Sequence, residues 1–115
     1  MAETKVREVY FSDEFNTFFE SLDNKVKEKY LWTIQITETI KDLPSSYVKK
    51  LVDSDFYEMR VCVANNQYRT IIFTTDTGNI ISAKEIYLLN SFLKRSTKDY
   101  KKQLKVATKL LEELL

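Results

Sequence analysis

Histidine is absent from the 115-residue chain, and glycine and cysteine each occur once. Without histidine the chain cannot form a Ser-His-Asp triad, a zinc site with a histidine ligand or a histidine acid–base pair. The single glycine, Gly78, cannot supply the glycine-rich motifs that hold dinucleotides or nucleotide phosphates. The single cysteine, Cys62, excludes an intrachain disulfide and Cys-x-x-Cys chemistry. Because the chain has no histidine, any proton transfer must use another type of side chain.

Long apolar segments are also missing. No run approaches the ~20 apolar residues that a membrane-spanning helix needs. Residues 1–3 do not begin a signal-peptide pattern, so we expect a cytoplasmic protein that contacts no membrane. Hydrophobic residues make up 43% of the chain and charged residues 30%, which is typical of a soluble globular domain. Because repeats, linkers and low-complexity segments are absent, we expect one domain over residues 1–115.

The charges are unevenly distributed along the chain, although the total is only +1. Residues 1–55 carry a net charge of −3, and residues 56–115 carry +4. Most of the positive excess lies between Lys94 and Lys109, where Asp99 is the one acidic residue. A polyanion should therefore approach the C-terminal half.

The N-terminal part is predicted to form a strand and two helices. Residues 5–11 are rich in β-branched and aromatic residues, and Ser12 or Asp13 can cap the helix that follows. A second helix should run from about Lys25 to the residue before Pro44, where helical geometry is disfavoured. The aromatic residues of both helices are expected in the core: Phe15, Phe18, Phe19, Tyr30 and Trp32.

The clearest strand covers residues 56–63, where apolar and polar residues alternate with period two. One set should face the helices: Tyr57, Met59, Val61 and Val63. The other set should face the opposite side: Phe56, Glu58, Arg60 and Cys62. The strand therefore separates core positions from candidate site positions.

The segments around this strand complete a predicted sheet. Residues 64–67 form a turn in which the asparagines tolerate positive φ, and residues 68–74 return as the hairpin partner. The last strand falls within residues 80–93, and the pattern is clearest at 86–92. Val48 and Leu51 are predicted to lie in a brief turn before the first of these strands.

The final helix is predicted to begin near Ser96 or Thr97, either of which can cap it, and to run to the end. It has a narrow apolar stripe: Leu104, Ala107, Leu111 and Leu114. Lysines follow the same spacing about half a turn away: Lys98, Lys102, Lys105 and Lys109. One side should pack on the domain, and the other should present ammonium groups to water or to a phosphate backbone.

Basic residues from separate strands should meet on one side of the sheet. Arg60 and Arg69 are predicted on paired strands near one turn, and Lys94 and Arg95 end the last strand. Arginine offers a planar fork of donors and lysine a compact charge, which together suit a phosphate or a phosphorane-like transition state. Such a site needs no metal ion or cofactor.

Three segments occur in a characteristic order: Phe56-Tyr57-Glu58-Met59-Arg60, Tyr68-Arg69, and Phe92-Leu93-Lys94-Arg95-Ser96-Thr97-Lys98. In this order they resemble the RelE/HigB toxins, especially the phage-associated HigB-like branch. The resemblance implies an α+β, RelE-like fold, in which an N-terminal strand and a two-helix hairpin pack on a mostly antiparallel sheet with a C-terminal helix. It also implies the toxin of a type II toxin-antitoxin system. Such a toxin is an mRNA interferase that cleaves mRNA on the ribosome and is inhibited by a cognate antitoxin, commonly a helix-turn-helix, HigA-like protein.

The resemblance also implies roles for single residues. Arg69 would contact the scissile phosphate, Arg95 or Lys94 would stabilise the transition state, and Tyr100 would stack on a base. Arg60 and Glu58 occupy positions where RelE has lysines, one of them a proposed general base. Because arginine is a poor base, the chain would use Glu58 or a lysine such as Lys94, or would depend mainly on electrostatics. Glu58 would alternatively orient the arginines. Three helix lysines are further candidates for RNA binding: Lys98, Lys102 and Lys105.

The implied reaction is attack of the ribose 2′-hydroxyl on the adjacent phosphorus, without a metal ion, to leave a 2′,3′-cyclic phosphate and a 5′-hydroxyl. Simpler interpretations remain for the same residues. Glu58, Arg60 and Arg69 would form an ion pair on an exposed sheet face, worth ~0–1 kcal/mol, and the lysines a solvated face. The chain would then be a non-catalytic module that binds RNA, the ribosome or another protein.

Overall fold

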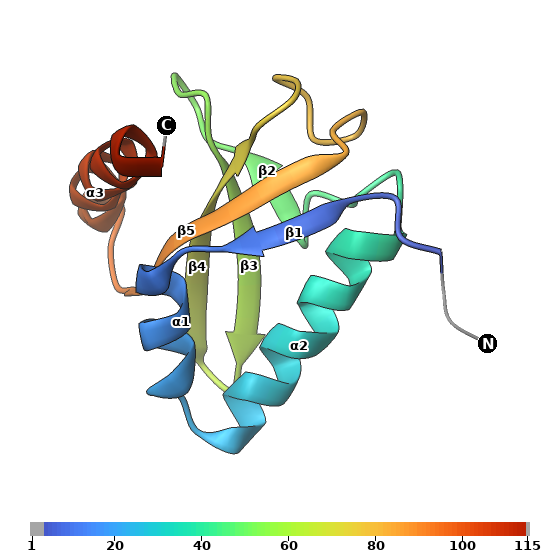
Figure 1. Ribbon diagram of the computed structural model, residues 1–115. Coiled ribbons are helices and arrows are strands. Elements are labelled where there is room, and N and C mark those ends of the chain that lie inside the picture. Colours follow the sequence, from blue (N-terminus) through green and yellow to red (C-terminus); the bar gives the residue numbers. More distant parts are fainter. Residues whose placement is uncertain (1–3, 115) are drawn as a thin grey trace.

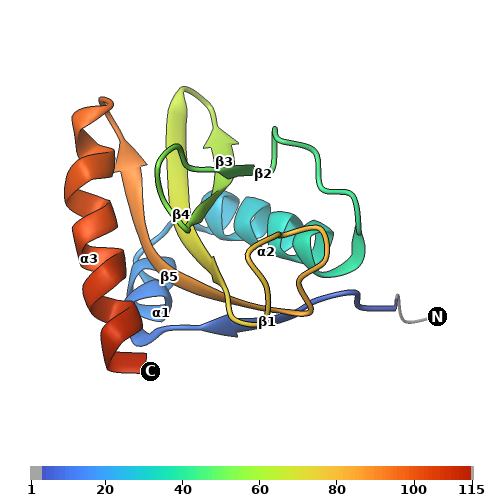
Figure 2. The same cartoon turned by 90° about the horizontal axis from the view of Figure 1, so that it is seen from above.

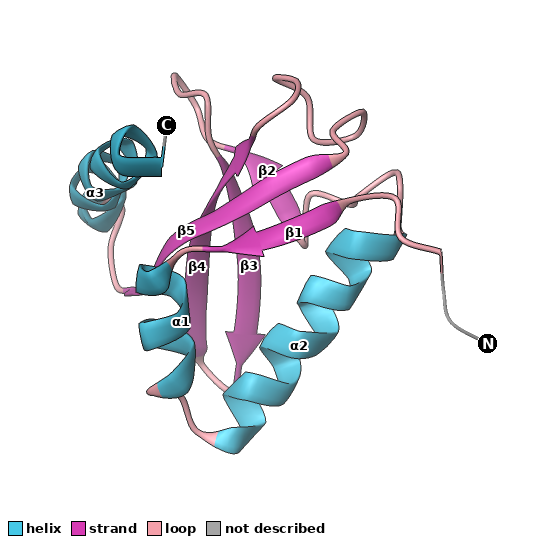
Figure 3. Cartoon of the chain, viewed as in Figure 1, coloured by secondary structure: helices cyan, strands magenta, loops and turns pink. Residues whose placement is uncertain are grey.

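The computed structural model, which describes residues 4–114, is a five-stranded sheet with helices on both sides (Figures 1 and 3). The elements follow in the order β1 (Glu8–Phe11), α1 (Asp13–Glu20), α2 (Asn24–Thr39), β2 (Val48–Lys50), β3 (Tyr57–Val63), β4 (Asn66–Thr74), β5 (Glu85–Lys94) and α3 (Lys98–Leu114). The spatial strand order is β1-β5-β4-β3-β2. Only the β1–β5 pair is parallel. This architecture confirms the predicted α+β fold and is compatible with a RelE-like fold.

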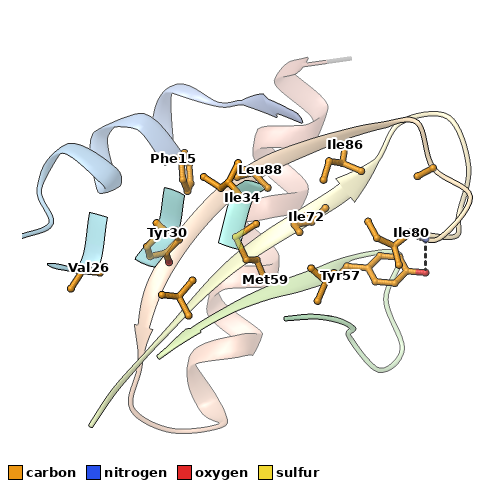
Figure 4. Close-up of a cluster of buried hydrophobic side chains, with 13 residues drawn as sticks. Phe15, Val26, Tyr30, Ile34, Tyr57, Met59, Ile72, Ile80, Ile86 and Leu88 are labelled. Carbon is orange, nitrogen blue, oxygen red and sulfur yellow. Dashed lines mark hydrogen bonds between the residues drawn. The ribbon is translucent and has the colours of Figure 1, made fainter. Parts of the chain in front are cut away.

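The two faces of the sheet have separate apolar cores, because successive side chains of a strand point to opposite faces. Helices α1 and α2 cover one face and α3 covers the other (Figures 1 and 2). The first core contains Tyr57, Met59 and Val61 of β3, as their alternation predicts. Figure 4 shows Met59 close to Ile34 of α2, whereas Tyr57 lies at the other end of this core beside Ile80. The second core lies under α3: Phe56, Ile71, Leu89, Phe92 and Ala107.

Side-chain caps define the starts of the two N-terminal helices. The hydroxyl oxygen of Ser12 accepts the N–H of Phe15 at 3.0 Å, as the sequence predicts. The Asp23 carboxylate accepts the N–H of Val26 at 3.1 Å and caps α2. Each cap supplies an acceptor for a backbone N–H that has no partner within the helix.

Helix α2 ends at Thr39, so the prediction that it continues to the residue before Pro44 is wrong. Ile40 is already extended, with φ −95° and ψ 117°. The guanidinium of Arg7 donates to the carbonyls of Thr37 (3.1 Å), Ile40 (2.6 Å) and Lys41 (2.5 Å). A buried arginine from another part of the chain therefore binds a carbonyl in the last turn of α2 and two carbonyls directly after it, so the helix ends before the proline.

Three further predictions are corrected by the structure. Val48 begins a short edge strand, β2, rather than lying in a turn, because it pairs with Met59 across the ladder. In the β3–β4 turn the residue with positive φ is Ala64 (φ 54°), not an asparagine. The side chain of Trp32 is 45% exposed and is not a core residue, because it lies at the edge of the sheet against Tyr47.

The start of α3 agrees with the prediction, but the side chain that binds the backbone there differs. The helix begins at Lys98, and the carboxylate of Asp99 accepts the backbone N–H groups of Arg95 (2.8 Å) and Ser96 (3.0 Å). These hydrogen bonds lower the pKa of Asp99. The side chain that binds the backbone at the start of α3 is therefore the carboxylate of Asp99 inside the helix, rather than the predicted hydroxyl of Ser96 or Thr97 before it.

A register shift in β5 sets the position of α3. Thr70 pairs with Ser91 and Ile72 with Leu88, so both Leu89 and Asn90 stand opposite the single residue between Thr70 and Ile72. Leu89 packs in the core under α3, and the Asn90 amide donates to the side chain of Gln103 in α3 at 2.9 Å. The β-bulge thus directs two consecutive side chains at α3. Within residues 4–114, no helix combines the length and apolar character needed to cross a membrane.

Candidate functional site

Four charged side chains of β3, β4 and β5 share the sheet face under α3. Arg60 pairs directly with Arg69, and Gln67 pairs with Lys94. Glu58 lies two residues before Arg60 on the same strand. Residues that pair directly across strands point to the same face. Glu58, Arg60, Arg69 and Lys94 therefore form one group, the arginine site.

Glu58 holds the two arginines of the site side by side. Its Oε1 lies 3.6 Å from Nε of Arg60, and its Oε2 lies 3.5 Å from Nε of Arg69. Glu58 is 4% exposed and Arg69 3% exposed, whereas Arg60 is half-buried. Among residues 4–114, Oε2 of Glu58 has no hydrogen-bond partner. The Glu58 carboxylate therefore neutralises part of the positive charge of the two arginines, while its Oε2 accepts none of their N–H groups.

The guanidinium of Arg69 is fixed by three neutral acceptors. Its Nε donates to the hydroxyl of Tyr100 at 3.0 Å, Nη1 to the carbonyl of Tyr68 at 3.0 Å, and Nη2 to Oε1 of Gln67 at 2.7 Å. Because an arginine has five N–H donors, two remain for a ligand. Tyr100 and Gln67 also cover the group, so a phosphate reaches it only after one of these side chains moves.

Tyr100 brings α3 to the arginine site. Its ring packs edge-on against Phe92, with centroids 5.5 Å apart, and Nζ of Lys94 lies 5.5 Å from the ring centroid. Burial and the carboxylate of Glu58 raise the pKa of the Tyr100 hydroxyl, while Arg69 acts in the opposite direction. The hydroxyl therefore stays protonated at neutral pH and accepts the N–H of Arg69.

A small hollow opens beside the arginine site along the part of β3 that extends past β2, since β2 pairs with residues 57–59 of β3. Its volume is ≈ 200 Å³. The lining residues are Ser46, Arg60, Val61, Cys62, Gln67 and Arg69. Pockets for drug-sized ligands usually hold about 300–1,000 Å³. This hollow therefore suits a phosphate with part of a nucleotide rather than a whole small-molecule cofactor.

A larger hollow of ≈ 320 Å³ lies away from the arginine site. Its charged lining residues are Lys50, Asp55 and Asp76. Two carboxylates against one ammonium group make it a poor site for an anion. Charge rather than size therefore identifies the site beside Arg60 as the candidate.

Two groups of predicted residues lie outside the cluster. Arg95 is exposed in the loop after β5, where its backbone N–H binds Asp99. Three lysines are exposed on α3: Lys98, Lys102 and Lys105. Each residue of a helix is rotated by about 100° from the previous one, which places these lysines on the side of α3 away from Tyr100 and Ala107. The lysine row and the arginine site therefore face different directions.

Two site residues were missed by sequence reasoning. Lys49 pairs with Glu58 across β2 and β3, so it projects from the same face, and it is exposed. The sequence signal for Lys49 is one apolar residue, Val48, followed by polar ones. This pattern is too short to identify a strand of three residues. The second missed residue is Gln67, whose side-chain oxygen accepts a hydrogen bond from the guanidinium of Arg69.

The family model described as "Phage derived protein Gp49-like (DUF891)" matches residues 17–112. The match includes β3, β4, β5 and nearly all of α3, and thus every residue of the arginine site. No curated protein and no solved structure matches the chain.

Proposed function

We propose that this chain, which belongs to the Gp49-like family of phage-derived proteins within the RelE/HigB-type toxin group, is the toxin of a type II toxin-antitoxin system. Its activity is that of an mRNA interferase, a metal-independent endoribonuclease that cleaves mRNA on the ribosome. The observation that carries this proposal is the direct pairing of Arg60 with Arg69 beside an open hollow. The pairing brings two permanent cations to a space of the size of a phosphodiester.

The proposed reaction transfers the phosphoryl group from the 5′-oxygen of the next nucleotide to the 2′-oxygen of the nucleotide that already carries it. The 2′-hydroxyl oxygen bonds to the adjacent phosphorus and gives up its proton to water. The bond between phosphorus and the 5′-oxygen breaks, and the 5′-oxygen takes up a proton. The products are a 2′,3′-cyclic phosphate and a 5′-hydroxyl. Arg60 and Arg69 stabilise the negative charge that builds up on the phosphoryl oxygens.

Glu58 is assigned a positioning role rather than that of a base. Its carboxylate is buried behind the arginines, and both oxygens face guanidinium nitrogens. It therefore cannot reach a 2′-hydroxyl in the hollow without breaking the arrangement. Lys94, half-buried above the ring of Tyr100, adds a third cation at the β5 side of the site. Exposed Arg95, in the loop directly after β5, offers a fourth cation to the RNA beyond Lys94.

The partner that this function requires is a cognate antitoxin, a helix-turn-helix, HigA-like protein. Residues 1–55 carry a net charge of −3, and residues 56–115 carry a net charge of +4. Polyanionic RNA is attracted to the second of these.

Primer extension on translated messages tests the proposal. Production of the wild-type chain should generate discrete new 5′ ends that carry a hydroxyl group. Arg60→Ala should slow their appearance by about 10²- to 10³-fold, the usual cost of losing one preorganised donor to a developing anion. The matched control is Lys25→Ala, because Lys25 is exposed in the first turn of α2. A chain that binds messages but leaves no new ends would refute the nuclease, and an Arg60→Ala variant that cleaves normally would refute the role of Arg60 in it.

A further inference from the structure

An aromatic pair, exposed Trp32 of α2 and half-buried Tyr47, lies on the α2 side of the sheet beside the edge strand β2, and Tyr47 directly follows a residue that lines the hollow of the arginine site. The ring centroids of Trp32 in α2 and Tyr47 before β2 are 5.6 Å apart, in an edge-to-face arrangement. Nζ of Lys29 lies 4.5 Å from the centroid of the Trp32 ring. Trp32 is nevertheless 45% exposed. Its ring is thus held by two neighbours while nearly half of its surface remains open to solvent.

The aromatic pair is connected directly to the arginine site through the backbone. The N–H of Arg60 donates to the carbonyl of Tyr47 at 2.8 Å. Ser46, the residue before Tyr47, lines the hollow together with Arg60. Consecutive Cα atoms are about 3.8 Å apart, so a chain that leaves the hollow past Ser46 meets Tyr47 next. The edge of β3 therefore links a phosphate-sized hollow to an aromatic surface.

The charges around the aromatic pair also favour a polyanion. Lys29 borders Trp32, and Lys49 follows Tyr47 by two residues and is exposed. Residues 45–52 contain no acidic side chain. Single-stranded nucleic acids bind proteins through such a combination, in which cations follow the phosphates and aromatic rings stack on the bases.

We propose that Trp32 and Tyr47 form a nucleobase-stacking subsite for the single-stranded RNA that leaves the arginine site over the β3 edge. The inference rests on the proposed function, since it extends the path of the same substrate. In this arrangement the scissile phosphate occupies the hollow, the next phosphates pass Ser46 and Lys49, and a base displaces Lys29 from the face of Trp32. The subsite binds bases through their ring faces and is therefore tolerant of sequence.

The chain offers a direct probe of this subsite, because Trp32 is its single tryptophan. Intrinsic tryptophan fluorescence therefore reports on this position alone. The ligand is a single-stranded RNA octamer that is methylated on every 2′-oxygen and so cannot be cleaved by 2′-hydroxyl attack. The wild-type chain should bind the octamer with quenching of Trp32 fluorescence. A dinucleotide of the same chemistry, which fills only the hollow, should bind without quenching.

Variants then measure the contribution of the ring by anisotropy of a labelled octamer. Trp32→Leu should bind the octamer roughly 5- to 150-fold more weakly, the usual effect of losing one base-stacking aromatic ring. Its affinity for the dinucleotide should be unchanged. Trp32→Phe should recover part of the loss because it restores an aromatic face. Leu31→Ala is the matched control, since Leu31 is 57% exposed on the same helix.

The outcomes separate this inference from the proposed function. Cleavage of messages together with unchanged octamer affinity in Trp32→Leu, or octamer binding without quenching, overturns the subsite alone. Failure of the wild-type chain to bind either oligonucleotide overturns the subsite, and primer extension on translated messages then decides the ribonuclease separately. If Trp32 fluorescence responds to the antitoxin but not to the octamer, the pair is a protein interface and the inference is wrong.

Discussion

Oε2 of Glu58 lies 3.5 Å from Nε of Arg69, and both side chains are almost completely buried. Removing one member of a buried ion pair typically costs about 3–5 kcal/mol, and Glu58 would then keep half-buried Arg60, 3.6 Å away, as its remaining cation. We expect Arg69→Ala to lower the free energy of unfolding by this amount. Exposed Arg95→Ala should change it by less than about 0.5 kcal/mol. Urea denaturation of both variants measures the difference.

The double variant Glu58→Leu with Arg69→Leu is the control for this pair. Because it removes both charges, it should be more stable than the sum of the two single changes predicts, by about 0.5–3 kcal/mol. Strict additivity would show that the two side chains do not interact. A further consequence concerns activity: loss of toxicity in Arg69→Ala alone would not separate catalysis from folding. Half-buried Arg60 therefore gives the cleaner catalytic test.

The arginine site was partly predictable from local patterns. The alternation in β3 places Glu58 and Arg60 opposite Met59 and Val61, and a short turn then brings Arg69 beside Arg60. Both features depend on residues close in sequence. The position of Tyr100 over Arg69 depends instead on the bulge in β5 and on the path of α3, which no local pattern encodes.

The exposed lysines of α3 should contribute to RNA affinity in a salt-dependent manner. Each phosphate contact with a single strand contributes about 0.7 to the slope of log K against log salt concentration. Changing Lys98, Lys102 and Lys105 together to glutamine should therefore reduce the slope by about 2. The measurement is oligonucleotide binding between low and physiological salt. The control changes three exposed lysines elsewhere to glutamine: Lys25, Lys41 and Lys84. An equal slope in both triple variants would show that the lysine row is only a solvated face.

Tyr30 should make the fold sensitive to alkaline pH. Its hydroxyl lies 3.1 Å from Oγ1 of Thr70, and burial raises its pKa from 10.0 to about 12. Because the folded chain favours the protonated hydroxyl, the stabilisation is complete below pH 10 and is lost as the pH rises towards 12. Two pH units correspond to about 3 kcal/mol at most.

Urea denaturation from pH 8 to pH 12 measures this dependence. Tyr30→Phe should cost about 1 kcal/mol at pH 8, since it loses a buried hydrogen bond. The difference between the wild-type chain and Tyr30→Phe should then shrink and change sign between pH 10 and pH 12. Parallel curves for the two proteins across this interval would contradict the assignment.

Arg7 should be among the most important residues for stability, although nothing in the sequence distinguishes it from other basic residues. It is 1% exposed, and besides the α2 carbonyls its Nε donates to the carbonyl of Ile80 at 2.8 Å. Burial lowers the pKa of the guanidinium, so its hydrogen bonds must offset the loss of hydration.

Arg7→Met leaves these carbonyls without donors and should cost at least about 3–5 kcal/mol. Arg7→Lys should recover only part of this, because one ammonium group cannot span carbonyls on two segments. Hydrogen exchange should show the loss first at the C-terminal end of α2, while exposed Lys25→Ala should leave both measurements nearly unchanged. A stable Arg7→Met variant with normal protection at this end would mean that water replaces the guanidinium.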